Sequence, residues 1–150
     1  MTDALPVARA DIEAAHARIA AHVRRTPVIL PGRGAFGLDL DLVLKLECLQ
    51  HMGSFKPRGA FNSLLTSQVP DAGVAAASGG NHGAAVAYAA AQLGHRATIF
   101  VPEISSPVKI ARIRQAGADV HVGGARYADP AAACAAFRAL TGAIAIQPDD

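Results

Sequence analysis

Short apolar runs and longer alanine-rich stretches follow one another regularly in the second half of the chain. A run of about 4 to 8 apolar residues between turn residues is typical of a buried strand, and a longer run with helical spacing is typical of a helix. The pattern predicts strands rich in Val, Ile and Ala at residues 73–78, 96–101, 118–122 and 143–148. Between them it predicts helices at residues 82–93, 107–115 and 127–140.

This alternation of strand and helix predicts an α/β fold. Parallel strands joined by right-handed helical crossovers form an open parallel sheet with helices on both faces. The helix at residues 82–93 consists mainly of Gly, Ala and Val, so it can lie close to the sheet and is expected to be buried. Ligands of such sheets bind beyond the carboxyl ends of the strands. The turn that follows residues 73–78 is therefore a candidate binding site.

The first third of the chain is less regular. Asp11 is predicted to cap a helix that runs to about Val23, with an apolar stripe formed by Ile12, Ala15, Ile19 and Val23. Residues 41–47 alternate between apolar and polar side chains and are predicted to form a strand. A further helix is expected from Pro57 to about Thr66.

Composition narrows the class of protein. The 150 residues are 51% hydrophobic and 17% charged, which suits one globular unit with a substantial core. A net charge of +2 and scattered arginines exclude nucleic acid and anionic membranes as expected partners. The most apolar stretch, residues 83–94, is far shorter than the roughly 20 residues that span a bilayer.

The two cysteines and the N-terminal residues indicate the cellular compartment of the protein. Cys48 and Cys134 form no C-x-x-C pair, so we expect two buried thiols in a reducing environment. Residues 1–20 carry early acidic side chains and lack the continuous apolar core of a signal peptide. These features predict a soluble, cytoplasmic protein.

One of only three lysines lies in an unusual setting, within the stretch HMGSFKPRGAFNSL. Pro57 disfavours helical geometry at Lys56, which places this lysine at the N-cap of the following helix. The partial positive charge of a helix N-terminus and the nearby Arg58 both favour the neutral amine, the form that condenses with an aldehyde. The alternative is a surface lysine whose stem lies along the helix start. These local features leave both interpretations open.

The second candidate is the turn SGGNHG, residues 78–83. Exposed N–H groups and the dipole at the start of the next helix would bind an anion there. Ser78, Asn81 and His82 add side-chain donors. The alternative is an ordinary glycine turn that Ser78 or Asn81 caps. The spacing does not match G-x-G-x-x-G, so a dinucleotide site is not predicted.

Together, KLECLQHMGSFKPRGAFNSL and ASGGNHGAAVAYAAAQLG resemble the serine/threonine dehydratase group of fold-type II pyridoxal-phosphate enzymes. This group includes threonine ammonia-lyases and serine racemase. The resemblance continues through ATIFVPEISSPVKIARIRQAGADVHVGG, YADPAAACAAF and AIQPDD, and so covers nearly all of the chain after residue 25.

The resemblance implies a site and a reaction. Lys56 would bind the aldehyde of pyridoxal 5'-phosphate covalently, Phe55 would pack against the pyridine ring, and Asn81 would donate to the phenolic oxygen. The turn would bind the carboxylate of an amino-acid substrate, with the binding residues Ser78, Gly79, Gly80, Asn81 and His82. Lys56 would then remove the α-proton, and loss of the β-hydroxyl of L-serine or L-threonine would give a 2-oxo acid and ammonia. No metal is implied in this part of the chain.

Two departures from the group's pattern stand out. Met52 occupies a position that is often threonine in relatives, which puts the hydrogen bonding of that loop in doubt. Gly79 occupies the position of the serine that acts as the second base in serine racemase, so we expect dehydration with little racemisation. The Pro-Arg-Gly that follows Lys56 argues against the cysteine-synthase branch, and threonine synthase or another fold-type II lyase is a less favoured alternative.

Relatives in this group are much longer and bind the cofactor phosphate and pyridine nitrogen with C-terminal residues. The chain therefore resembles an N-terminal half: residues 1–48 would belong to a large domain, residues 49–146 to a small α/β domain, and residues 147–150 would return to the large domain. The full-length form is expected to be a homodimer. A non-catalytic α/β module that binds a small anion, or a protein that complements a missing half, are the competing classes.

Overall fold

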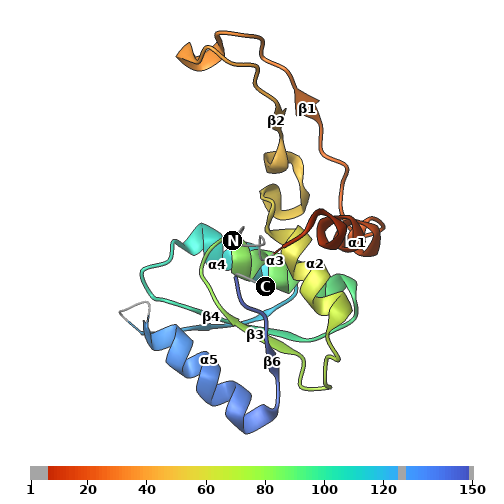
Figure 1. Cartoon of the computed structure of the whole chain (residues 1–150). Helices are drawn as coiled ribbons and strands as arrows, with labels where there is room; N and C mark the ends of the chain where they lie inside the picture. Colours follow the sequence, from red (N-terminus) through yellow and green to blue (C-terminus); the bar gives the residue numbers. More distant parts are fainter. Residues whose placement is uncertain (1–6, 125–127, 149–150) are drawn as a thin grey trace, which may run out of the picture.

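The computed structural model describes residues 7–124 and 128–148, and its centre is a four-stranded parallel sheet (Figure 1). The strand order is β5-β4-β3-β6. Their bounds are Val74–Ala77 for β3, Ala97–Val101 for β4, Asp119–Val122 for β5 and Ile144–Ala145 for β6. All three strand pairings are parallel, which confirms the expected open α/β sheet.

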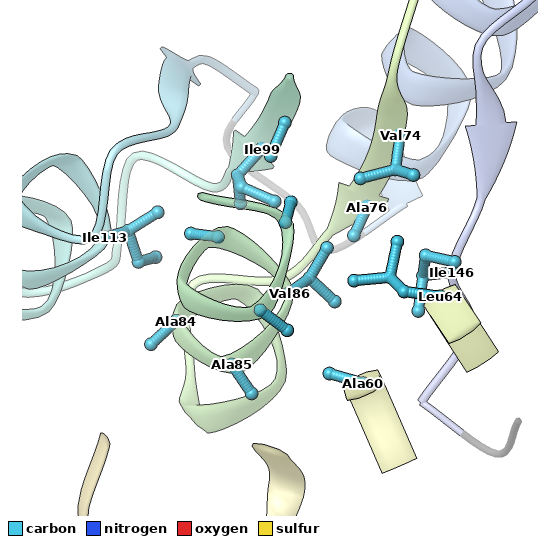
Figure 2. Close-up of a cluster of buried hydrophobic side chains, with 14 of the residues drawn as sticks. Ala60, Leu64, Val74, Ala76, Ala84, Ala85, Val86, Ile99, Ile113 and Ile146 are labelled. Atoms are coloured by element: carbon cyan, nitrogen blue, oxygen red, sulfur yellow. The ribbon is translucent and has the colours of Figure 1, made fainter. Parts of the chain in front are cut away.

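Alternate residues along the strands face two different layers. Val74, Ala76 and Ile99 belong to the larger core, which surrounds α3, Asn81–Gln92 (Figure 2). Ala75 and Phe100 point to the opposite face and pack with Cys134 under α5, Ala128–Thr141. Figure 1 shows α5 on one side of the sheet and α3 on the other, so both faces are covered as the sequence predicts.

Helix α3 is the most deeply buried element, as its small side chains predict. Residues 83–87 are all buried, and the helix lies between the sheet and α2, Lys56–Thr66. Ala60 and Leu64 of α2 face it in Figure 2. On its other side α4, Pro107–Gln115, contributes Ile113 to the same core. The alanine and glycine side chains allow these close approaches.

The sequence overestimated the length of the last strand. We predicted a strand over residues 143–148, but β6 contains only Ile144 and Ala145, which pair with the first half of β3. Beyond Ile146 the chain leaves the sheet, because the carbonyl oxygens of Ile146 and Pro148 accept hydrogen bonds from side chains of α3 and α2.

Helix α1, Arg9–Ile19, begins and ends earlier than predicted. Asp11 does not cap it from the N-cap position; it lies in the first turn, where its carboxylate accepts from the Ala8 N–H at 2.8 Å. The predicted stripe is covered only at its end, because Ile19 is 5% exposed whereas Ile12 is 61% exposed.

Residues 28–45 form a projection that we call the arm, which extends away from the sheet and helices in Figure 1. Its two strands, β1 Val28–Ile29 and β2 Leu44–Lys45, are antiparallel and only two residues long. The predicted strand over residues 41–47 is therefore largely absent. The 3-10 turns are η1 Ala35–Gly37 at the arm's tip, then η2 Glu47–Leu49 and η3 His51–Gly53 between the arm and α2.

The two cysteines differ in environment. Cys134 is buried, and burial raises the pKa of its thiol, whereas Cys48 is exposed. Both are free thiols, so the expectation of two buried thiols is wrong for Cys48, which lies in the exposed turn η2. Among the residues that the structure describes, no helix is long and apolar enough to cross a membrane.

Candidate active site

Lys56 is the first residue of α2 rather than its N-cap. Phe55 takes the N-cap position with helical torsion angles, φ −69° and ψ −17°, so the extended geometry predicted for Lys56 is wrong. A following proline disfavours helical geometry without forbidding it. Two features stabilise the first turn of α2 in helical geometry. The Arg58 N–H donates to Phe55 O at 3.0 Å, and the Pro57 side chain is buried.

The amine of Lys56 lies at the edge of a small pocket. Its Nζ donates to Pro148 O at 2.8 Å and lies 5.0 Å from the centroid of the Phe55 ring. The pocket has a volume of about 170 Å³ and is lined by Phe55, Lys56, Gly59, Ala60, His82, Gln147 and Pro148. A primary amine therefore meets an apolar ring and a histidine in one concave site.

His82 links this pocket to the glycine turn. It lies in the first turn of α3, is 8% exposed, and its Nε2–H donates to Ile146 O at 2.9 Å. Since the carbonyl oxygen can only accept, the proton is on Nε2. The contact joins the start of α3 to the residues that follow β6, which also contact Lys56. The structure thus brings His82 and Lys56 together, although they are distant in sequence.

The turn before α3 has a glycine at the N-cap position of the helix. This residue, Gly80, provides no side-chain hydrogen bond to the first turn. Ser78 is buried, and its Oγ accepts from the Gly80 N–H at 3.3 Å, so Ser78 does bond the backbone of the turn. The helix dipole is directed at this end of the sheet.

Asn81 does not line the Lys56 pocket. It is exposed and lines a neighbouring cavity of about 240 Å³, together with Gly80, Ala84, Lys109 and Arg112. Gly79 lies deeper, where a Cβ atom would come 2.2 Å from Ser105 Oγ and 3.0 Å from Val101 Cγ1. Of the residues predicted for the site, Lys56, Phe55 and His82 share one pocket. Ser78, Gly79, Gly80 and Asn81 do not line that pocket, and Gly80 and Asn81 line the neighbouring cavity instead.

The loop that leads to Lys56 is fixed by buried polar contacts that the sequence did not reveal. Gln50 is almost fully buried and bonds both the N–H and the carbonyl of Arg24. His51 stacks on Tyr88 of α3, and a hydrogen bond of 3.1 Å joins the Tyr88 hydroxyl and His51 Nδ1. Burial and the nearby Arg24 lower the pKa of His51, which favours the neutral ring. Ser54 Oγ is buried without a hydrogen-bond partner in the described part of the chain.

A second missed feature connects the arm to the helix of Lys56. Arg58 binds Glu47 in a bidentate ion pair, with Nε–Oε2 at 2.7 Å and Nη2–Oε1 at 2.8 Å, and the Thr26 hydroxyl donates to Oε1 at 2.6 Å. The hydrogen bond from Arg58 chiefly lowers the pKa of Glu47, to about 2, against the opposing effect of burial. The only signal in the sequence was an acidic residue in the apolar stretch LKLECL.

The Glu47–Arg58 ion pair predicts that the free energy of unfolding depends on pH. The folded-state pKa of Glu47 lies below its ordinary value of 4.5, so the native fold binds fewer protons than the unfolded chain. The stabilisation is present above pH 4.5 and is lost as the pH falls towards 2. Glu47→Gln should lower the free energy of unfolding at pH 7 by about 1–2 kcal/mol, since solvent screens the partly exposed pair.

The measurement is urea unfolding at several pH values between about 2.5 and 7, wherever the fold persists. Glu13→Gln is the matched control, because Glu13 forms an exposed i,i+4 pair with Arg9 and should contribute only about 0.3 kcal/mol. Equal losses in the two variants, or an unchanged pH dependence in Glu47→Gln, would contradict the role given to Glu47.

The fold and the site together define a class of protein: an open parallel α/β fold with a lysine amine in a pocket beside a helix N-terminus at the carboxyl edge of the sheet. The chain belongs to the pyridoxal-phosphate-dependent enzyme family, whose model matches residues 19–150. Its fold is that of the fold-type II members.

Individual relatives point to one group within this family. The chain is 42% identical over 120 residues to a putative threonine dehydratase of Sinorhizobium fredii. The matched region makes up 79% of this chain and 36% of that protein. It is 37% identical to the L-threonine ammonia-lyase of Geobacter sulfurreducens, over 93% of this chain and 35% of that one. A solved threonine deaminase structure from T.th. matches with a TM-score of 0.83 and 39% identity, over 95% of this chain and 45% of that one. The chain thus spans about a third of the length of the two curated relatives.

The residues present fit the aldehyde end of pyridoxal phosphate. Lys56 supplies a primary amine at the edge of a pocket, and the exposed ring of Phe55 supplies an apolar surface beside it. The N-terminal end of α3, with Gly80 at its N-cap, directs its helix dipole at this site, which favours an anionic ligand.

Proposed function

We propose that this chain provides the N-terminal part of a pyridoxal-phosphate-dependent dehydratase, or ammonia-lyase, that acts on L-threonine and L-serine. One observation carries the proposal: Lys56 and His82, from two different helices, line a single pocket beside the start of α3. The names of the relatives support threonine as a substrate of this group. L-serine is the smaller β-hydroxy amino acid of the same chemistry.

Each residue of the site has a role in this proposal. The cofactor, when bound, withdraws electrons from the substrate's α-carbon. Lys56 Nζ would hold the aldehyde of the cofactor and would accept the substrate's α-proton as a general base. Phe55 would contact the ring of the cofactor, and Asn81 would donate to its phenolic oxygen. The residues of the turn that would bind the substrate's carboxylate are Ser78, Gly79, Gly80, Asn81 and His82.

The domain organisation of the whole protein is also a prediction that we retain from the resemblance of the sequence. We propose that residues 1–48 belong to a large domain, residues 49–146 form a small domain, and residues 147–150 return to the large domain. A homodimeric full-length form and a location in the cytoplasm are predictions of the sequence that we retain.

The function is tested by assaying 2-oxo acid and ammonia from L-threonine and L-serine. The 150-residue chain is expected to turn over little alone and to become active with a polypeptide that supplies the remaining length of the Geobacter relative. Full activity of this chain by itself would show that the site needs no further residues. Absence of both products in the combined system would refute the dehydratase.

We also predict that the active form makes little D-amino acid. A second base is needed on the opposite face of the substrate, and Gly79 has no side chain there. A serine at this position would also require Ser105 to change its side-chain rotamer, because the added Cβ would lie 2.2 Å from Ser105 Oγ and 3.0 Å from Val101 Cγ1. Incubating L-serine and measuring D-serine by chiral chromatography checks this, and D-serine formation at a rate comparable to pyruvate formation would contradict it.

A further inference from the structure

A second concave site, which we call the α5 groove, lies between α5 and the strands β3 and β6. It has a volume of about 270 Å³ and extends from His82, at the start of α3, to Arg138 on α5. Most of its walls are alanine, from three elements: Ala75, Ala76 and Ala77 of β3, Ala131 and Ala135 of α5, and Ala145 of β6. Because an alanine side chain reaches little beyond the backbone, the helix and the strands leave space between them here.

Arg138 is the cationic side chain of the α5 groove. Its Nε atom is buried without a hydrogen-bond partner, and Arg138 forms no ion pair within residues 7–124 and 128–148. A buried donor without an acceptor is unfavourable, so a ligand that accepts from Nε would stabilise this arrangement. Cys134, one turn before Arg138, also lines the groove. Burial raises the pKa of its thiol, and the positive charge of Arg138 opposes that rise, so this charge acts within the groove.

We propose that the α5 groove is a second binding site, which takes a small monocarboxylate with a short apolar chain. A guanidinium group can donate from Nε and one Nη in parallel, which matches the two oxygens of a carboxylate. A single cation suits a single negative charge, and the alanine walls suit an apolar chain. The volume lies below the roughly 300–1,000 Å³ of pockets for drug-sized molecules, so the ligand is small.

The α5 groove is separate from the Lys56 pocket but shares one wall with it. His82, Gln147 and Pro148 line both sites. The carbonyl groups of the same segment bond the side chains of the candidate active site, since Ile146 O accepts from His82 and Pro148 O from Lys56. A ligand in the groove therefore contacts the segment that fixes the position of the Lys56 amine.

The products of the proposed reaction belong to the class of ligand that the α5 groove would take. A 2-oxo acid formed from L-threonine or L-serine is a small monocarboxylate with a short chain. This assignment of a physiological ligand rests on the proposed function. The groove, its alanine walls and the charge of Arg138 do not depend on it.

The test is titration of the isotope-labelled 150-residue chain with butanoate, followed by NMR chemical shifts. Butanoate has the predicted charge and no ketone that would condense with Lys56, and butanamide is its neutral counterpart. Arg138→Gln removes the charge, whereas Ala135→Leu fills the groove from an exposed position on α5. Arg114→Gln is the matched control, because Arg114 is exposed on α4 and does not line the groove.

Butanoate is expected to bind saturably and to shift the amide signals of residues 134–138 and 145–147 most. Its affinity should fall at least about tenfold in Arg138→Gln and in Ala135→Leu, and less than about twofold in Arg114→Gln. Butanamide should bind the wild-type chain at least about tenfold more weakly than butanoate.

Circular dichroism must show that the variants are folded, and if Arg138→Gln is not, Ala135→Leu and butanamide decide. The absence of a saturable shift would overturn the proposal, as would equal affinities for butanoate and butanamide. Binding that both groove variants leave unchanged would place the carboxylate elsewhere, for example at the turn of residues 78–83, and would also overturn it.

Binding and catalysis separate the two proposals. Lys56→Ala should bind butanoate as the wild-type chain does, because Lys56 does not line the α5 groove. If butanoate binds in the groove but the combined system releases no 2-oxo acid or ammonia, the groove stands and the dehydratase fails. If the products appear while butanoate does not bind, or binds equally well to Arg138→Gln, the dehydratase stands and the groove fails.

Discussion

Replacing Lys56 by alanine is expected to abolish covalent capture of pyridoxal phosphate and all formation of 2-oxo acid. Lys56 is the lysine that lines the pocket with Phe55 and His82, and its Nζ is the nucleophile that the proposed chemistry needs. Lys56→Arg should fail equally, since a guanidinium stays protonated and does not condense with an aldehyde. The change should therefore exceed about 10³-fold in kcat, with the fold intact.

The measurements are the imine absorbance band and the formation of product, both in the presence of a polypeptide that supplies the remaining length of the Geobacter relative. Arg114→Ala, at an exposed position on α4, is the control and should keep both signals. A comparison of Lys56→Ala with the control Arg114→Ala also decides between an enzyme and a non-catalytic anion-binding module. A module would retain its affinity for a small anion in Lys56→Ala and would never have shown the band. Turnover by Lys56→Ala above one tenth of the wild-type rate would exclude Lys56 as the essential amine.

The largest effect on folding is expected at Gly83, within α3. An alanine in a helix interior is normally more stable than glycine by about 1 kcal/mol. Here the added Cβ would lie 2.2 Å from the backbone oxygen of Ser78 and 3.1 Å from Ile99 Cγ2. The helix would have to move away from the strand, so Gly83→Ala should lower the free energy of unfolding by about 2 kcal/mol or more.

Urea unfolding monitored by circular dichroism measures this loss. Gly80→Ala, at the N-cap of the same helix, is the matched control because its Cβ would meet only Ser78 Oγ, at 3.9 Å. It should change stability by less than about 1 kcal/mol. A Gly83→Ala variant that is as stable as the wild-type chain would mean that α3 does not pack as closely on the sheet as the structure shows.

The layered part of the fold could be predicted because its two central strands, β3 and β4, are buried. Runs such as GVAAAS and RATIFV are apolar throughout and need cover on both faces, and the small residues of α3 indicate a buried helix. The arm could not be predicted in the same way. Its alternation over residues 41–47 indicated a strand, yet only Leu44 and Lys45 pair, and the neighbouring Val43 is 66% exposed.

The site was predictable in its residues and less so in its geometry. Lys56 and the turn at residues 78–83 stand out because each combines glycine with chemically active side chains. The sequence did not place Lys56 inside α2, because a local steric rule for proline was outweighed by the contacts of the first turn. Beyond the acidic residue in LKLECL, it gave no sign of the Glu47–Arg58 pair, and it gave none of the hydrogen bonds to the carbonyl groups after β6, which depend on the packing of distant segments.

The central claim is tested most directly by reducing the cofactor complex with borohydride and mapping the labelled peptide by mass spectrometry. The chain has three lysines, so the result is a choice among Lys45, Lys56 and Lys109. We predict a single phosphopyridoxyl adduct on Lys56 when the chain is combined with a polypeptide that supplies the remaining length of the Geobacter relative. An adduct on Lys45 or Lys109, or no adduct at all under those conditions, would contradict the account.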